Sequence, residues 1–253
     1  MTFNSPIGNA KADHLVQLLE LQPDDRAFDA GCGTGEFLLR VVAGYPVYGL
    51  GIDTDSQCIA AARDSAARRE LASRCEFRAG DVNDLSAEQS RFDLGICIGS
   101  THAFGASEAA YPNTIQRLSE IVRPGGLIVI GEGYWKQEPA AEYLKLIGDP
   151  VGIYRDHGGN ISFAEQCGLL PLYAMVSSED EWDHFEWSHQ QKIRRLAETN
   201  PKDARFAERL ARARQWRDGY LRWGRSTMGF GIYLFRTPEA TKDAGQDECP
   251  IRR

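Results

Sequence analysis

The sequence predicts an α/β protein with a mostly parallel sheet and helices on both faces. Apolar runs of strand length alternate with amphipathic stretches of helical period through residue 130, the order that builds parallel βαβ units with right-handed crossovers. The first run leads into a glycine-rich turn, residues 29–35 (DAGCGTG). At 253 residues and 42% hydrophobic content, the chain can bury one large core, so we expect a single domain over residues 1–253.

The glycine turn follows the apolar pair Ala27-Phe28 and opens a helix at Glu36. Backbone amides at a helix N-terminus, unshielded by side chains, suit a nucleotide-type cofactor. The spacing differs from the Gly-x-Gly-x-x-Gly of dinucleotide sites, because Glu36 takes the third glycine slot and Gly35 comes one residue early. The acidic Asp29 favours a ligand that carries positive charge. A purely structural strand-to-helix turn is the alternative at this point.

Carboxylates also end the next two predicted strands. Residues 47–53 form a buried strand that ends at Asp53, where a carboxylate can accept both hydroxyls of an adenosine ribose. Residues 76–82 form the third strand, in which Asp81 can accept from the exocyclic amine of adenine and the Val82 amide can reach a ring nitrogen. Each carboxylate alone would be a solvated turn residue. In order after the glycine turn, they predict an adenosine site.

With these residues the sequence resembles the class I S-adenosylmethionine-dependent methyltransferases, over about the first half of the chain. Residues 92–99 match the fourth strand of that family, and residues 118–130 match its next helix, turn and fifth strand. The resemblance implies S-adenosylmethionine as cofactor, S-adenosylhomocysteine as product, and a Rossmann-like seven-stranded sheet whose last strand is antiparallel. The cofactor-binding residues that it implies are Asp29, Gly31, Cys32, Gly33, Gly35, Asp53, Thr54, Asp81, Val82, Ile98 and Gly99. Residues 131–135 and 181–186 look like an uncharacterised bacterial methyltransferase family, which brings no substrate with it.

The second half predicts a helical hairpin between two closing strands, residues 170–176 and 229–235. Apolar side chains recur at helical spacing from Trp182 to Leu196 and from Phe206 to Trp223, with a break at Asn200-Pro201. Ligands of open α/β sheets bind beyond the carboxyl ends of strands, so we expect the hairpin to cover the site as a lid. The alternative is that its aromatic stripe is simply core.

We therefore divide the domain into five segments. They are an N-terminal helical segment (1–24), the cofactor-binding core (25–177), the lid insertion (178–226), the last strand (227–237) and a polar tail expected to be disordered (238–253). The chain lacks an apolar run of membrane-spanning length and a signal-peptide pattern, so we expect a cytoplasmic enzyme with reduced cysteines. The oligomeric state stays open.

The loops after strands four and five are expected to line the acceptor pocket. His102, as a neutral imidazole, could take a proton from the acceptor, or it could simply satisfy local backbone groups. Glu132, beside two aromatic side chains, could hold a cationic amine. Trp182 lies near the root of the lid. The predicted catalytic residues are His102 and Glu132, and the predicted substrate-binding residues are Ser100, His102, Glu132, Tyr134, Trp135, Trp182, Asp183 and Glu186. The two aromatics after strand five could instead pack against the lid.

Missing motifs narrow the chemistry. Residues 97–100 stand where exocyclic-amine nucleic-acid methyltransferases carry an Asn/Asp-Pro-Pro-aromatic sequence, and strand four does not end in a magnesium-binding carboxylate. We predict a metal-independent methyltransferase that acts on an amine, hydroxyl or activated carbon of a small molecule by in-line displacement. The net charge of −7 argues against a general polyanion binder. Two alternatives stay open: an RNA methyltransferase, because residues 192–225 hold eleven Lys or Arg against four Asp or Glu, and a non-catalytic cofactor-binding protein.

Overall fold

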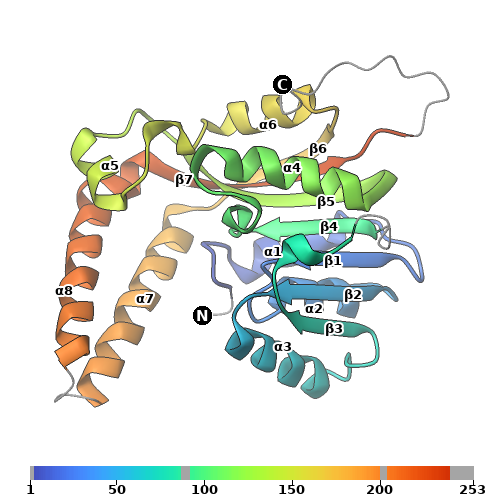
Figure 1. The fold of residues 1–253 in the computed structure, drawn as a ribbon, viewed down its shortest axis with the longest axis horizontal. Helices are drawn as coiled ribbons and strands as arrows, with labels where there is room; N and C mark the ends of the chain where they lie inside the picture. Colours follow the sequence, from blue (N-terminus) through green and yellow to red (C-terminus); the bar gives the residue numbers. More distant parts are fainter. Residues whose placement is uncertain (1–2, 87–91, 200–203, 240–253) are drawn as a thin grey trace.

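A seven-stranded sheet in the order β3-β2-β1-β4-β5-β7-β6 forms the centre of the protein (Figure 1). The structure is a computed structural model that describes residues 3–86, 92–199 and 204–239. The strands are Arg26–Ala30 (β1), Tyr48–Asp53 (β2), Cys75–Ala79 (β3), Phe92–Ile98 (β4), Val122–Trp135 (β5), Leu170–Val176 (β6) and Met228–Arg236 (β7). β7 runs antiparallel to both of its neighbours, and the other paired strands are parallel. This confirms the predicted Rossmann-like sheet with its antiparallel seventh strand.

Helices cover both faces of the sheet. One face carries α1 (Asn9–Gln17), α2 (Glu36–Gly44) and α3 (Ser56–Arg68), and the other carries α4 (Ala110–Ile121) and α6 (His157–Gln166). Alternate side chains of the central strands serve the two cores, which is why these strands read as continuous apolar runs. In β5, Val129 packs on the α1–α3 side, whereas Ile128 and Ile130 pack on the α4–α6 side.

β5 is longer than the sequence predicted. It pairs with β4 only as far as Gly131, but β7 pairs with it as far as Trp135, opposite Met228. The prediction of a loop after residue 130 was therefore wrong, and Glu132, Tyr134 and Trp135 lie inside a strand. The physical reason is that β7 supplies partners for the backbone groups of β5 beyond the end of β4. β3 is shorter than expected and ends at Ala79, so that Asp81 and Val82 follow it.

Two long helices, which follow β6 and precede β7 along the chain, project from the sheet (Figure 1). They are α7 (Glu179–Thr199) and α8 (Ala204–Gly219), which packs along α7 and continues through a π-helical turn, η6 (Tyr220–Gly224), into α9 (Arg225–Thr227). The shorter elements are α5 (Ala141–Ile147) and the 3₁₀ turns η1 (Val82–Asp84), η3 (Thr101–Phe104), η4 (Ser107–Ala109) and η5 (Val151–Ile153).

Two sequence predictions fall outside the described residues: the helix break at Asn200-Pro201 and the tail from residue 240. Among the helices that the structure describes, none combines the length and the apolar character needed to cross a bilayer.

Candidate active site

The glycine turn between β1 and α2 is shaped by three glycines with positive φ. Gly31, Gly33 and Gly35 have φ values of 66°, 53° and 74°, a region that costs other residues roughly 1–2 kcal/mol. A Cβ on Gly31 would lie 2.4 Å from Cβ of Ser100, and one on Gly35 would lie 2.5 Å from the ring of Phe77. A Cβ on Gly33 would meet no described atom within 4 Å. The turn is therefore packed tightly at both ends and open in the middle.

Asp53, at the end of β2, ties the glycine turn to the loop that follows β2. Its Oδ2 accepts from the Gly33 amide at 2.8 Å, and its Oδ1 accepts from the Asp55 amide at 2.9 Å. Asp55 in turn caps α3 by accepting from the Gln57 and Cys58 amides. A carboxylate oxygen can accept more than one hydrogen bond, so Asp53 keeps acceptor capacity for ligand hydroxyls.

Asp29 is a buried carboxylate with a perturbed pKa. It is 4% exposed, and burial, followed by the nearby Asp53, raises its pKa to about 8. Within the described part of the chain, no group is found donating a hydrogen bond to its side chain. Because an unpaired buried carboxylate is costly, this position fits a ligand that brings positive charge, as the sulfonium and ammonium groups of S-adenosylmethionine do.

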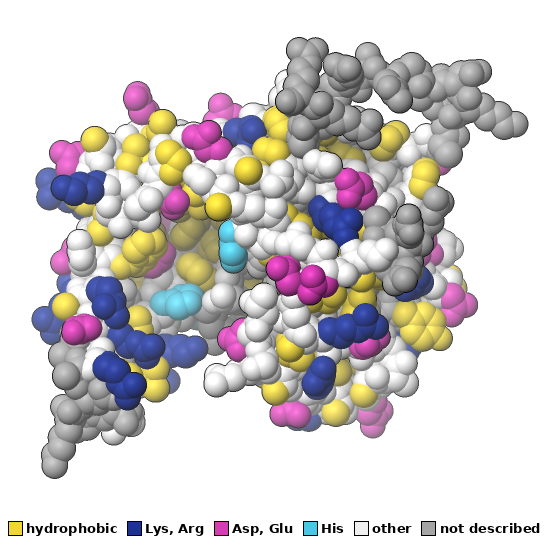
Figure 2. All heavy atoms as spheres, in the orientation of Figure 1, with side chains coloured by type: hydrophobic (Ala, Val, Ile, Leu, Met, Phe, Trp, Pro, Cys, Tyr) yellow, Lys and Arg dark blue, Asp and Glu magenta, His cyan; other side chains and the backbone are white. Residues whose placement is uncertain are grey.

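A cleft of about 880 Å³ lies between the glycine turn and α7. Figure 2 shows this hollow between the projecting helices and the sheet, with Lys and Arg side chains gathered on the side of the helices. The N-terminal segment also contributes to the cleft. The described residues that line it are Phe3, Asn4, Ser5, Asp29, Gly31, Cys32, Gly33, Thr34, Glu36, Phe37, Asp53, Asp55, Cys58, Ile98, Gly99, Ser100, His102, Ser188, His189, Gln191, Lys192, Arg195 and Leu196.

Many of the residues predicted from the sequence meet in this cleft. Those that line it are Asp29, Gly31, Cys32, Gly33, Asp53, Ile98, Gly99, Ser100 and His102. Gly35 is buried at the start of α2, and Thr54 is exposed beside Asp53. Asp81 is exposed and caps η1 by accepting from the Asn83 amide at 2.8 Å, while Val82 packs into the α4–α6 core. The turn that carries Asp81 contacts η3, because Asn83 Nδ2 donates to the Ala103 carbonyl at 2.9 Å.

Glu132 lies in the α4–α6 core and not on the cleft, which corrects the expected position. It is 8% exposed, and its Oε1 accepts from the Gly133 amide at 2.7 Å. Burial raises the pKa of Glu132, while hydrogen bonds from the Thr101 hydroxyl and the Gly133 amide, and the charge of Arg155, act in the opposite direction. Thr101 begins the η3 turn that carries His102. Through its bond to Thr101, Glu132 therefore supports this turn from the core.

Of the two aromatic residues expected beside Glu132, Trp135 packs at the root of the helical hairpin and Tyr134 packs against α6. Trp135 Nε1 donates to the Val151 carbonyl at 2.8 Å, and its ring lies 6.3 Å from that of Tyr143. The Tyr143 ring lies 6.4 Å from that of Trp223 at the end of the hairpin. Tyr134 contacts the ring of His157 at 5.2 Å. The alternative prediction, that these aromatics pack against the hairpin, therefore holds for Trp135.

The residues predicted at the root of the hairpin hold its helices together. Asp183 accepts from the Tyr220 hydroxyl at 2.6 Å and from Arg225, and the Tyr220 bond is the main cause that lowers its pKa. Glu186 is 7% exposed and accepts from Trp216 Nε1 at 2.8 Å, while burial raises its pKa. Trp182 packs against the α1–α3 core, and its indole nitrogen is buried with no partner among the described residues.

Sequence reasoning missed the face of α7 that borders the cleft. His189, Lys192 and Arg195 follow one another at intervals of three residues, about one helical turn apart. A usable signal was present, because His189 falls within the otherwise apolar stripe from Trp182 to Leu196. The start of α7 is fixed to the N-terminal segment, where Glu181 accepts from the Gly8 amide at 2.8 Å and forms an ion pair with Lys11.

Comparisons with known proteins agree with this geometry. Residues 27–126 match the sequence profile of the methyltransferase domain family. An S-adenosylmethionine-dependent methyltransferase from Geobacter sulfurreducens, solved in complex with S-adenosyl-L-homocysteine, superposes with a TM-score of 0.83 and 27% identity over 92% of each chain. The protein is an S-adenosylmethionine-dependent methyltransferase. Its cofactor is S-adenosylmethionine.

The methyltransferase also has full-length relatives. It is 27% identical over 236 residues to the uncharacterised protein YjhP of Escherichia coli, covering 91% of this chain and 92% of that protein. It is 27% identical over 239 residues to the 27-O-demethylrifamycin SV methyltransferase of Amycolatopsis mediterranei, covering 90% of this chain and 82% of that enzyme. The likeness to YjhP confirms the resemblance to an uncharacterised bacterial family.

Proposed function

We propose that the methyltransferase transfers a methyl group to a small-molecule acceptor by metal-independent in-line displacement. The observation that carries this proposal is the cleft, in which α7 and the glycine turn border one space of about 880 Å³. This volume falls in the range of small-ligand sites, roughly 300–1,000 Å³. The relative that is named for 27-O-demethylrifamycin SV supports an acceptor of this kind.

Residues on both walls of the cleft have roles in this proposal. Bound S-adenosylmethionine supplies a methyl group made electrophilic by a positively charged sulfur. Asp53 would accept the ribose hydroxyls and Asp29 would pair with positive charge, while Asp81-Val82 would hold the adenine. Ser100 would border the acceptor.

The hairpin of α7 and α8 acts as a lid in this proposal. Methyl transfer requires that the nucleophile, the methyl carbon and the sulfur lie in line and that water is excluded. A structural element that closes over the site can align these groups and exclude water. Glu132 would act through Thr101 to hold the turn that carries His102, so it is a positioning residue here.

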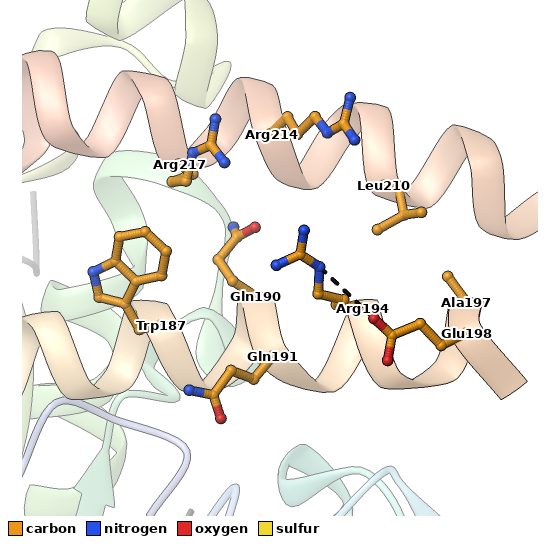
Figure 3. Close-up of a pocket in the computed structure, with 9 residues that line it drawn as sticks. All are labelled: Trp187, Gln190, Gln191, Arg194, Ala197, Glu198, Leu210, Arg214 and Arg217. Atoms are coloured by element: carbon orange, nitrogen blue, oxygen red, sulfur yellow. Dashed lines mark ion pairs between the residues drawn. The ribbon is translucent and has the colours of Figure 1, made fainter.

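An RNA-binding hairpin is the competing function, and the ion pairs of the hairpin argue against it. Arg194 pairs with Glu198 at 3.9 Å, Arg212 with Glu208 at 3.8 Å, and Arg217 with Asp218 at 2.6 Å. Figure 3 shows the groove of about 360 Å³ between α7 and α8, where Arg194 is paired across one helical turn. Such pairs are typical of a solvated helix face.

The test uses S-adenosylmethionine that carries a tritiated methyl group. A panel of hydroxyl, amine and activated-carbon acceptors, including 27-O-demethylrifamycin SV, is compared with single-stranded RNA. We expect label in the small-molecule fraction and weak RNA binding at about 0.15 M salt. RNA methylation with a steep salt dependence of binding, and no labelled small molecule, would favour the RNA methyltransferase. Cofactor binding without any transfer would favour the non-catalytic protein.

A further inference from the structure

We propose that His189, on the cleft face of α7, is the general base of the reaction and that the acceptor presents an acidic hydroxyl, such as a phenol or an enol. This inference rests on the proposed small-molecule function and assigns the nucleophile of the same site. It draws on three features: the place of His189 in the cleft, the fixed orientation of its ring, and the positive charge that follows it along α7.

The imidazole of His189 is held in one orientation and one tautomer. Its Nδ1 lies 3.0 Å from the Phe185 carbonyl oxygen, one turn earlier in α7. A carbonyl oxygen can only accept, so Nδ1 carries the hydrogen and Nε2 of the neutral ring carries a lone pair. The ring also packs edge-on against the Phe185 ring at 4.6 Å. A fixed ring with a free acceptor nitrogen is what a general base requires.

The other histidine of the cleft lacks this support. His102 is exposed on η3, and no side-chain hydrogen bond of its ring is found among the described residues. The two histidines come from different elements, His102 from the η3 turn that follows the central strand β4 and His189 from α7 of the lid. A base on the lid reaches the acceptor when the lid closes, so proton removal would be coupled to the exclusion of water.

Charges along α7 favour an acceptor oxygen that becomes negative. Lys192 and Arg195 follow His189 on the cleft face. The pKa of Asp55 is lowered mainly by the hydrogen bonds that it accepts from the Gln57 amide and from Cys58, and the nearby charge of Lys192 lowers it further. Burial raises the pKa of Glu186, while its hydrogen bond from Trp216 and the charge of His189 act in the opposite direction. A hydroxyl oxygen next to this face would lose its proton more readily.

The reaction step balances without a further reactant. His189 Nε2 takes the proton of the acceptor hydroxyl while the acceptor oxygen forms its bond to the methyl carbon. The sulfur keeps the electron pair of the broken carbon–sulfur bond and becomes a neutral thioether. The positive charge that leaves the sulfur reappears on the imidazolium, which then loses its proton to solvent.

The first test needs no acceptor. Long-range ¹H–¹⁵N correlation spectra of protein labelled with ¹⁵N-histidine and saturated with S-adenosylhomocysteine report the tautomer of each imidazole, and His189→Gln assigns the His189 signals. We expect a protonated Nδ1 and an unprotonated Nε2 at a pH where the ring is neutral. A hydrogen on Nε2 of the neutral ring would overturn the proposal.

The second test measures methyl transfer to the acceptor found with the tritiated cofactor. His189→Ala should lower kcat about a hundred- to ten-thousand-fold and lose the acidic limb of the pH–rate profile, with unchanged binding of S-adenosylhomocysteine. Added imidazole should restore part of the rate. His184→Gln, an exposed residue on the same helix, is the matched control and should keep the wild-type profile.

Three results would contradict the assignment. They are an intact acidic limb in His189→Ala, its loss only in His102→Gln, and methylation confined to amines or carbon. If no small molecule is methylated while the Nε2 lone pair is confirmed, the proposed acceptor class fails and the tautomer assignment stands. The two failures are therefore distinguishable.

Discussion

Replacing Asp53 with alanine removes the carboxylate that ties the glycine turn to the next loop. In the structure this side chain accepts from the Gly33 amide at 2.8 Å and the Asp55 amide at 2.9 Å, and the ribose hydroxyls would use its remaining lone pairs. Loss of hydrogen bonds to a charged group is worth about 1.5–3 kcal/mol. At about 1.4 kcal/mol for each tenfold change, the dissociation constant of S-adenosylhomocysteine should rise about 10- to 150-fold.

Isothermal titration calorimetry with S-adenosylhomocysteine measures this change. Asp53→Asn is the graded variant, because an amide oxygen can still accept from Gly33 while the charge and one acceptor are lost. Its affinity should fall between those of the wild type and Asp53→Ala. Asp64→Ala, at an exposed position on α3, controls for a general loss of surface charge. An Asp53→Ala protein that stays folded and binds with wild-type affinity would refute the reasoning.

Three further predictions follow from the same geometry. Gly31→Ala should lower both cofactor affinity and thermal stability, since the new Cβ would lie 2.4 Å from that of Ser100. Adding Ser100→Gly should recover only part of the lost affinity and stability, because the strain of positive φ remains. Calorimetry that shows no effect of Gly31→Ala alone would contradict this prediction. Asp29 has a pKa of about 8 against 3.8 for an ordinary carboxyl, so between these values the unfolded chain is ionised while the folded chain keeps the proton. The free energy of unfolding of the ligand-free protein should therefore fall as pH rises through this window, and a cationic cofactor should release a proton near pH 7; Asp29→Asn should abolish both effects, as pH-dependent unfolding and calorimetry in two buffers would show. Glu186→Gln should keep the hydrogen bond to Trp216 and remove the cost of ionising a buried carboxyl whose pKa is raised. The free energy of unfolding of this variant above pH 7 should therefore equal or exceed that of the wild type. A clearly lower free energy of unfolding in chemical denaturation would contradict this prediction.

Features fixed by short-range sequence were predictable. The glycine turn needs positive φ at three nearby positions, and Asp53 is the last residue of a buried strand. These local requirements leave a mark in the residues themselves, so the cofactor side of the cleft could be predicted before its geometry was known.

Features fixed by distant partners were not predictable. The last residues of β5 look like a loop until β7, about a hundred residues later, pairs with them, and this pairing places Glu132 inside the core. The rotation of α7 is set by contacts of Asp183 and Glu186 with the elements that follow it. Sequence periodicity gave the helix but not the direction of its faces, so residues at its root were predicted to bind substrate and His189 was missed.

A crystal structure grown with S-adenosylhomocysteine tests the central claim most directly. We expect the ligand in the cleft between the glycine turn and α7, with its ribose hydroxyls on Asp53 and its sulfur in the same space as His102 and His189. Density for the ligand elsewhere on the protein, or a bound ligand from which α7 is turned away, would contradict this arrangement.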